Sequence, residues 1–196
     1  MEADPVNFQE LMRNLDLNPS LALRVIPLNS AATNFDSEVI LNVRRSIDGD
    51  GNLNTGLSSL VMSTLGPRSC SVNALRIDTL LTTSISPISF INIDCEGAES
   101  EVLKGASATI QKDLPIIFWE AAFSLDIGTE NSNVSFCWVF LSDLGYAHFI
   151  VSDNGEFCVM DVFSEIESLG YDTDVLSVHK EKIPLLDHAN GIFRRI

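Results

Sequence analysis

Basic residues are scarce in this sequence, and their scarcity limits the partners that the chain can bind. It has 12 lysines and arginines against 27 aspartates and glutamates, which gives a formal net charge of −15 over 196 residues. An acidic surface repels the phosphates of nucleic acids and of anionic membranes. We therefore expect no nucleic acid and no membrane as partners, and we attribute the excess acidity to solubility.

Cysteine is also sparse, and long apolar segments are lacking. Cys70, Cys95, Cys137 and Cys158 form no C-x-x-C pair and have no histidine cluster beside them, so a zinc site is not expected. The first residues are acidic and no apolar stretch follows them, unlike a signal peptide. The longest apolar runs are far short of the roughly 20 residues that span a membrane. The sequence thus indicates a reduced, cytoplasmic protein.

Apolar residues are plentiful enough for one buried core. They make up 45% of the chain, and no repeat or linker divides it, so we expect a single domain over residues 1–196. Near its start, Asp4 can cap a helix whose first residue is Pro5. The apolar residues that follow recur at helical spacing and form a single stripe: Phe8, Leu11, Met12 and Leu15.

The next part of the chain, up to residue 77, is typical of short strands. Apolar and β-branched residues predict strands at 22–28, 38–43, 57–62 and 70–77. A polar segment rich in Gly, Asn and Asp, at 46–56, predicts a loop between the second and third of them. We therefore expect residues 38–77 to form an antiparallel hairpin insertion in the domain.

From residue 88 onward, strands alternate with helices. The pattern predicts strands at 88–94, 116–121 and 147–151, with helices at 96–112 and 132–144 between them. Strands joined by helices in this way run parallel through right-handed crossovers. In the tail we expect strands at 157–162 and 191–196, and an acidic loop over 164–190.

Acidic residues follow two of these strands at the point where each strand ends. Asp94 ends the strand 88–94, and Glu120 lies near the end of 116–121. Ligands of open parallel sheets bind beyond the carboxyl ends of the strands, so these two carboxylates are candidate site residues. The helix that follows Asp94 opens with three more acids: Glu96, Glu99 and Glu101.

Three interpretations of these acids are open. The dipole of a helix favours acids near its N-terminus by roughly 0.3–1 kcal/mol each, which accounts for Glu99 and Glu101. Carboxylates on one rim of a sheet also suit Mg²⁺ or Ca²⁺. Asp94 and Glu96, which lie nearest the strand end, are the candidates for a catalytic or cofactor-orienting role.

Residues 90–106 carry the most specific pattern in the sequence. They comprise an apolar strand, then Asp-x-Glu-Gly-Ala-Glu, then x-x-Val-Leu-x-Gly-Ala. This pattern resembles the signature of FkbM-type methyltransferases. Further segments resemble the same family in the order expected along the chain: 2–8, 54–60, 75–81, 115–120 and 144–146. The resemblance covers about residues 2–151.

The resemblance implies a class I methyltransferase-like (Rossmann-like) α/β fold, in which a mostly parallel sheet binds S-adenosyl-L-methionine. In this fold class the acid that ends the second strand holds the ribose hydroxyls of the cofactor, a role that falls to Glu2. Asp94 is the second cofactor-binding candidate. The family's first strand and its glycine-rich turn are missing from the sequence, so we expect weak or absent cofactor binding by these residues alone.

The resemblance further implies an O-methyltransferase that acts on a hydroxyl of a sugar or a secondary metabolite. A neutral hydroxyl is a poor nucleophile, so the reaction benefits from a base, for which Asp94 is the first candidate and Glu96 and Glu120 the next. The polar side chains available to bind this small-molecule acceptor lie in the hairpin insertion: Asn54, Ser58 and Ser59.

Two other functions are consistent with the sequence. A truncated or degenerate methyltransferase-like module would bind a partner without the cofactor, which the lack of a glycine-rich turn favours. A carboxylate–metal hydrolase would use Asp94, Glu96 and Glu99, although no histidine cluster supports it. Three further residues lie inside predicted apolar elements and are best explained as core: His148, Trp119 and Trp138.

Overall fold

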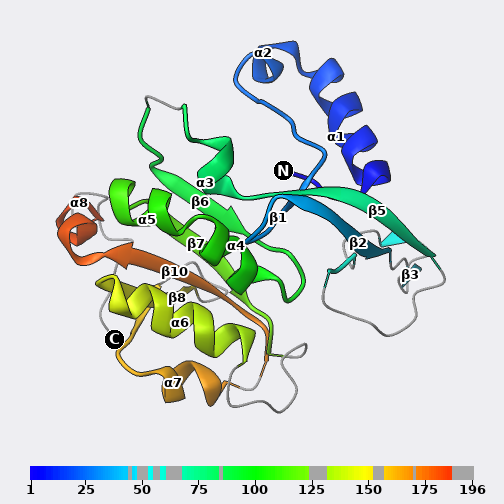
Figure 1. The fold of residues 1–196 in the computed structure, drawn as a ribbon. Coiled ribbons are helices and arrows are strands. Elements are labelled where there is room, and N and C mark those ends of the chain that lie inside the picture. The colour runs from blue at the N-terminus through cyan, green and yellow to red at the C-terminus, as the bar shows by residue number, and fades with distance from the viewer. Residues whose placement is uncertain are drawn as a thin grey trace.

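The computed structural model describes residues 1–43, 46–47, 53–54, 58–60, 68–83, 86–123, 132–151, 157–169 and 171–186. At 46–47, 53–54, 68, 151 and 185–186 only the backbone is described. A central sheet covered by helices, a smaller second sheet and a helical N-terminal segment make up this part of the chain (Figure 1).

The central sheet has five strands and is mixed. In spatial order they are β6 (Phe90–Ile93), β7 (Ile116–Ala121), β10 (Thr173–His179), β8 (Tyr146–Val151) and β9 (Phe157–Met160). β6 and β7 pair in parallel, whereas the other neighbouring pairs are antiparallel. β6, β7 and β8 therefore run in the same direction, as expected, but β10 lies between β7 and β8.

The expectation of a mostly parallel sheet is thus wrong, and the reason lies in the tail. The sequence predicts a loop over 164–190, but this segment contains most of α7 (Phe163–Glu167) and all of β10. The four residues at 175–178 are all buried, so β10 contacts the core on both of its faces. A strand buried on both faces lacks polar alternation, and the acids around it hide the short apolar run that remains.

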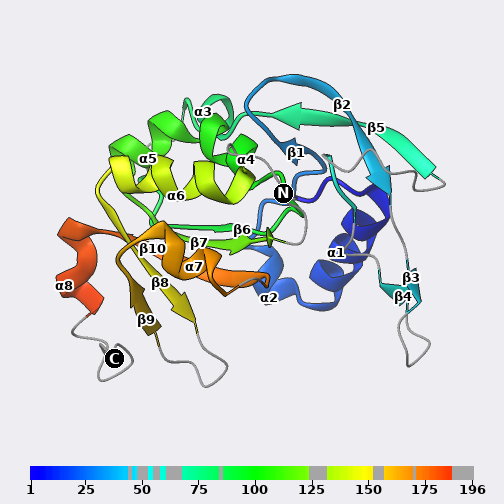
Figure 2. The same cartoon turned by 90° about the horizontal axis from the view of Figure 1, so that it is seen from below.

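Helices cover one face of the central sheet. α4 (Glu99–Gly105), α5 (Ser107–Asp113) and α6 (Asn133–Asp143) lie together on that face, as Figure 2 shows. They bury a core with the strands that includes Val102, Leu103, Ile110, Ile117, Trp119, Val134, Leu141 and Val175. The sequence predicts one helix over 96–112, whereas the structure divides it at Ala106. After β10, the short η2 (Lys180–Lys182) and α8 (Ile183–Leu186) follow.

The second sheet is built around a long hairpin. β2 (Ser37–Val43) and β5 (Arg68–Leu75) pair antiparallel along their length, and β1 (Ala31–Ala32) joins β5 in parallel. Between them, β3 (Ser46–Ile47) and β4 (Leu53–Asn54) form a short antiparallel pair. Of the strand predicted at 57–62, residues 58–60 are described, with one bridge from Ser59 to Asn42.

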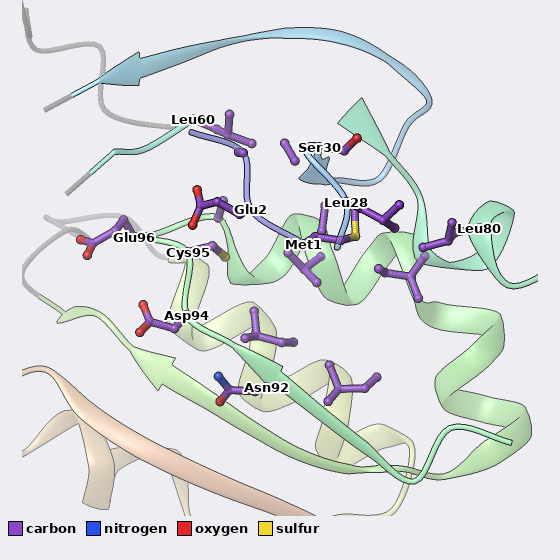
Figure 3. Close-up of a pocket in the computed structure, with 18 of the residues that line it drawn as sticks. Met1, Glu2, Leu28, Ser30, Leu60, Leu80, Asn92, Asp94, Cys95 and Glu96 are labelled. Carbon is purple, nitrogen blue, oxygen red and sulfur yellow. The ribbon is translucent and has the colours of Figure 1, made fainter. Parts of the chain in front are cut away.

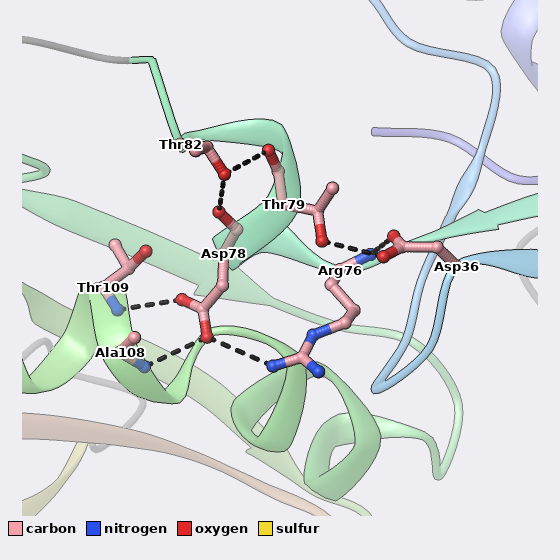
Figure 4. Close-up of polar contacts among 7 residues, drawn as sticks. All are labelled: Asp36, Arg76, Asp78, Thr79, Thr82, Ala108 and Thr109. Atoms are coloured by element: carbon pink, nitrogen blue, oxygen red, sulfur yellow. Dashed lines mark hydrogen bonds and ion pairs between the residues drawn. The ribbon is translucent and has the colours of Figure 1, made fainter.

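A carboxylate joins the second sheet to the helical layer (Figure 4). Asp78, in α3 (Ile77–Leu80), accepts the backbone N–H groups of Ala108 and Thr109 at 3.0 and 2.8 Å. The same carboxylate lies 3.6 Å from the guanidinium of Arg76. The first N–H groups of a helix have no partner within it, so a residue from another element satisfies those of α5.

The chain begins with the predicted amphipathic helix, α1 (Pro5–Leu17). Its cap is also as predicted, since Asp4 accepts the N–H of Val6 at 2.8 Å. None of the residues of α1 is buried, so the apolar stripe of this helix is only partly covered. No helix within the described residues has both the length and the apolar character needed to cross a membrane.

The strand predicted at 22–28 does not form. α2 (Pro19–Ala22) occupies its start, and the residues after it adopt no regular structure. Leu23 and Ile26 are 91% and 85% exposed, so the described part of the chain gives this apolar run little to pack against. Strand preference depends on such packing, which the sequence pattern alone does not supply. The strand predicted at 191–196 lies outside the described residues.

Candidate active site

A cavity of about 840 Å³ opens beside β6, at the edge of the central sheet (Figure 3). β6 lines one side of it, and the N-terminal residues 1–3 with several residues between 26 and 32 line another. Further lining residues come from α1, β2, α3, α4 and the segment 58–60. Its volume falls within the roughly 300–1,000 Å³ that is usual for small-molecule sites.

The cavity is apolar along most of its length and acidic at one end. Its apolar wall includes Leu28, Leu41, Leu80, Ile91 and Ile93. The acids Glu2, Asp94 and Glu96 lie together at the end away from Leu80, as Figure 3 shows. The structure thus brings Glu2 and Asp94 to one cavity from distant parts of the chain.

Backbone contacts hold Glu2 at this cavity. Its N–H donates to the carbonyl of Leu28 at 3.0 Å, and Asn29 Nδ2 donates to the Glu2 carbonyl at 2.9 Å. Oε1 of Glu2 accepts the N–H of Asp4 at 2.7 Å. The first residues therefore lie along residues 28 and 29, and the carboxylate of Glu2 is fixed at the cavity end.

The turn after β6 contains the candidate acid Glu96, and Glu99 at the start of α4 binds the backbone of this turn. Glu96 has φ 55° and Gly97 has φ 93°, a region of backbone conformation that favours glycine. Glu99 is fully buried, and its Oε1 accepts the N–H groups of Cys95 and Gly97 at 3.1 and 3.2 Å. Glu99 therefore makes specific hydrogen bonds to the turn, beyond any interaction with the helix dipole.

Glu120 belongs to a row of carboxylates across three neighbouring strands. It lies directly opposite Asp174 in the pairing of β7 with β10. Asp94 follows Ile93, which is opposite Trp119 in the pairing of β6 with β7. Because opposed residues on neighbouring strands project from the same face, Asp94, Glu120 and Asp174 lie side by side.

The surroundings of Glu120 and Asp174 change the acidity of these two carboxyl groups. Burial raises the pKa of Glu120 to about 7, and neighbouring carboxylates, Asp94 first among them, contribute to this rise. Burial and the charge of Asp94 also raise the pKa of Asp174. A carboxyl group with a pKa near neutrality is suited to exchange protons at physiological pH. Asp174 was not predicted, since the sequence places it in a loop.

Comparison with known families assigns the chain. The family model of the methyltransferase FkbM domain matches residues 1–147. The chain belongs to this family. A solved structure, of the methyltransferase FkbM from Methylobacillus flagellatus KT, shares the fold with a TM-score of 0.53 at 17% sequence identity. The match covers 90% of this chain and 35% of that one, so the chain spans about a third of its length. A comparison with curated proteins gives no match.

In this FkbM domain, the serines predicted to bind the acceptor hold other parts of the site. Ser59 is buried and donates to the backbone carbonyl of Glu96 at 2.8 Å. Ser58 lines the cavity and donates to Oδ2 of Asp4 at 3.1 Å. The side chain of Asn54 lies outside the described residues. The hairpin insertion thus contacts both the turn after β6 and the cap of α1.

His148 of the FkbM domain is a core residue, as predicted. Its Nδ1 lies 2.8 Å from Ser177 Oγ, its Nε2 lies 3.0 Å from Ser142 Oγ, and its ring stacks on Trp138. Because Trp119 Nε1 donates to Ser177 at 2.9 Å, the serine hydroxyl can donate its own proton to His148 Nδ1. Burial lowers the pKa of His148 to about 4, so the ring is neutral at physiological pH.

Proposed function

We propose that this FkbM domain transfers a methyl group from S-adenosyl-L-methionine to a hydroxyl of a small molecule, such as a sugar or a secondary metabolite. The observation that carries the proposal is the cavity at whose acidic end Glu2 and Asp94 meet. Membership of the family supports methyl transfer. The acidic end, in turn, supports a ligand that presents hydroxyl donors.

The cavity suits this cofactor in two respects. A carboxylate accepts from two hydroxyls of one sugar ring, which favours Glu2 as the ribose ligand and Asp94 as its neighbour. The apolar wall, with Leu28 and Ile91, favours a flat ring such as adenine. When bound, the cofactor would supply a methyl group made electrophilic by a positively charged sulfur.

Among the predicted catalytic acids, Glu120 is best suited to take the proton of the acceptor hydroxyl, although it does not itself line the cavity and lies beside Asp94, which does. Its pKa of about 7 leaves much of it ionised at physiological pH. The charges of the carboxylates nearby, Asp94 first among them and then Glu96, favour the protonated form once the proton has been accepted. Glu96, held in the turn at the cavity, is assigned to ligand orientation.

The alternative of a carboxylate–metal hydrolase gains no support from the structure. Within the described part of the chain, no three histidine, cysteine, aspartate or glutamate side chains are grouped to hold a metal ion. Glu99, one of the acids that this alternative needs, is occupied by hydrogen bonds to the turn. We therefore assign no metal to the site.

Calorimetric titration with S-adenosyl-L-methionine tests the proposal, on the chain extended at its N-terminus by the family's first strand and glycine-rich turn, because we expect these residues alone to bind the cofactor weakly. Replacing Glu2 with alanine removes the proposed ribose contact, so we expect at least about tenfold weaker binding, or ~1.4 kcal/mol. Glu10→Ala is the matched control, because it removes the same charge from an exposed position on α1. It should leave the affinity unchanged.

Two results would contradict the proposal. Equal affinity of wild type and Glu2→Ala would exclude the ribose role of Glu2. No binding of the extended protein at millimolar cofactor would instead support a degenerate module that recognises a partner without the methyl donor.

A further inference from the structure

Glu99 makes four hydrogen bonds although it does not line the cavity. Its side chain is completely buried. Oε1 accepts the N–H groups of Cys95 and Gly97, and the thiol of Cys95 lies 3.4 Å from the same oxygen. Oε2 accepts Nδ2 of Asn133 at 2.5 Å. A buried carboxylate requires such donors, because a charge left unpaired in the interior is strongly unfavourable.

The hydrogen bonds of Glu99 flank the one residue of the turn that holds an unfavourable backbone. Glu96 has a positive φ, which is disfavoured for any residue with a Cβ and persists only when the surroundings fix it. The N–H groups that Glu99 binds belong to the residues before and after Glu96. From the other side, Ser59 donates to the carbonyl of Glu96. The turn is therefore held on both sides.

Asn133 connects this turn to the next strand–helix crossover. It is the first residue of α6, which follows β7, and its Oδ1 accepts the N–H of Ser100 at 2.8 Å. Since the N–H of Ser100 can only donate, the amide of Asn133 must present Nδ2 to Glu99. The Glu99–Asn133 pair thus joins the segment after β6 to the segment after β7.

We infer that Glu99 and Asn133 are positioning residues, which hold the turn so that Asp94 and Glu96 face the ligand. This inference rests on the proposed function, because it assigns to those two acids a place in the methyl-donor site. Glu99 and Asn133 bind each other and the backbone of neighbouring residues, so we assign to neither of them a direct contact with the ligand. Their effect on the ligand passes through the backbone of residues 95–97.

Exchanging the carboxylate and the amide between positions 99 and 133 tests the pair. Each single variant changes the charge by one, and the double variant leaves the total charge unchanged. In Glu99→Gln the new amide N–H₂ faces the N–H₂ of Asn133, and in Asn133→Asp two carboxylates face each other. The double variant Glu99→Gln/Asn133→Asp reverses the direction of the bond. The amide introduced at position 99 would donate to the carboxylate introduced at position 133, while the acceptors for Cys95, Gly97 and Ser100 all remain.

Two measurements are made on each variant. The first is amide hydrogen exchange over residues 94–98, which reports the turn whether or not a ligand binds. The second is the affinity of the N-terminally extended protein for S-adenosylhomocysteine, the demethylated form of the cofactor. We expect each single variant to exchange faster and to bind at least about tenfold more weakly, and the double variant to recover both properties.

Ser177→Ala is the control for general destabilisation. Ser177 forms hydrogen bonds with Trp119 and His148 in the core, so its loss should lower the melting temperature without lowering the affinity for the ligand. Single variants that speed the amide hydrogen exchange of residues 94–98 but bind S-adenosylhomocysteine as tightly as this control would show that the pair has a purely structural role. A double variant that recovers neither property would overturn the inference.

The two failures are distinguishable. An extended protein that binds no S-adenosylhomocysteine refutes the proposed function, and the inference falls with it as a statement about ligand positioning. The exchange measurement then still decides the local claim: single variants that leave the exchange of residues 94–98 unchanged would show that Glu99 and Asn133 do not hold the turn.

Discussion

Glu120 is surrounded by other carboxylates, and its raised pKa gives a pH dependence of definite sign. A base acts in its ionised form, so we expect kcat/KM for methyl transfer to rise with pH through about 7. Glu120→Gln should lower the rate by about 10²–10⁴-fold and abolish this dependence. The measurement is the transfer of labelled methyl groups, across this pH range, to an acceptor that the protein methylates.

A neighbouring variant provides the control for Glu120. Asp174→Asn removes a negative charge directly opposite it, and should therefore shift the midpoint of the rate profile to lower pH without abolishing it. If Glu120→Gln kept the same pH dependence as the wild type, another group would be the base.

The same pKa acts on stability in the opposite sense to activity. The carboxyl of Glu120 titrates near 4.5 when unfolded and at about 7 when folded. Between these values the folded state binds more protons, so stability falls as pH rises from about 4.5 to about 7. Ionised Glu120 is thus a destabilised group at a candidate site, as is usual where activity and stability compete.

The helix α4 can pack closely against Thr33 because its last residue is Gly105. A Cβ on Gly105 would lie 1.9 Å from the backbone oxygen of Thr33, beside β1, and backbone cannot yield as a flexible side chain does. Gly105→Ala would therefore force α4 away from the second sheet. We expect a loss of about 1–3 kcal/mol in the free energy of unfolding, measured by urea denaturation.

An exposed position on the next helix gives the comparison for Gly105. Gln111→Ala in α5 changes no buried contact and should alter the free energy of unfolding by less than about 0.5 kcal/mol. In an unobstructed helix, alanine is more favourable than glycine by roughly 0.5–1 kcal/mol. A neutral or stabilised Gly105→Ala protein would therefore contradict the close approach.

Elements with a regular pattern and a single environment could be predicted from the sequence. The strand predicted at 116–121 is β7, with the same bounds, and the helix predicted at 132–144 contains α6. In β7 alternate residues are fully buried, and α6 is capped by Ser132, which accepts the N–H of Ser135. Local chemistry decides such elements, so a local pattern suffices to find them.

Features that depend on distant partners could not be predicted in this way. β10 is defined by its two neighbours, and Asp174 enters the carboxylate row only because β10 lies opposite β7. The role of Glu99 likewise could not be predicted from the sequence. The helix dipole accounts for an acid at this position, and only the folded turn reveals that its carboxylate bonds the residues on both sides of Glu96.

At the scale of the whole molecule, the candidate site lies where separate parts of the chain meet. The cavity takes its wall from the N-terminal residues, the second sheet and β6. Contacts between these parts fix its shape: Ser59 donates to the turn after β6, and Ser58 donates to Asp4 at the start of α1. A site assembled from distant segments depends on the stability of the entire domain, because loosening one contact displaces a wall of the cavity.

Charge acts on the domain as a whole, and it gives a further test. With a formal net charge of −15, like charges on the folded chain repel one another. The row Asp94, Glu120 and Asp174 concentrates that repulsion at one end of the strands β6, β7 and β10. Salt screens such repulsion over a distance of about 10 Å at 0.1 M. We therefore expect the melting temperature to rise by a few degrees between about 10 mM and 0.3 M sodium chloride.

The variant Glu120→Gln shows how much of this salt effect comes from the carboxylate row. At about pH 8 it removes an ionised group from the middle of the row, so its melting temperature should exceed that of the wild type in low salt. The gap between the two proteins should narrow as salt is added, because screening weakens the repulsion that the variant lacks. A wild type whose melting temperature is flat or falls with salt would show that attractive pairs, such as Lys104 with Glu101, outweigh the repulsion.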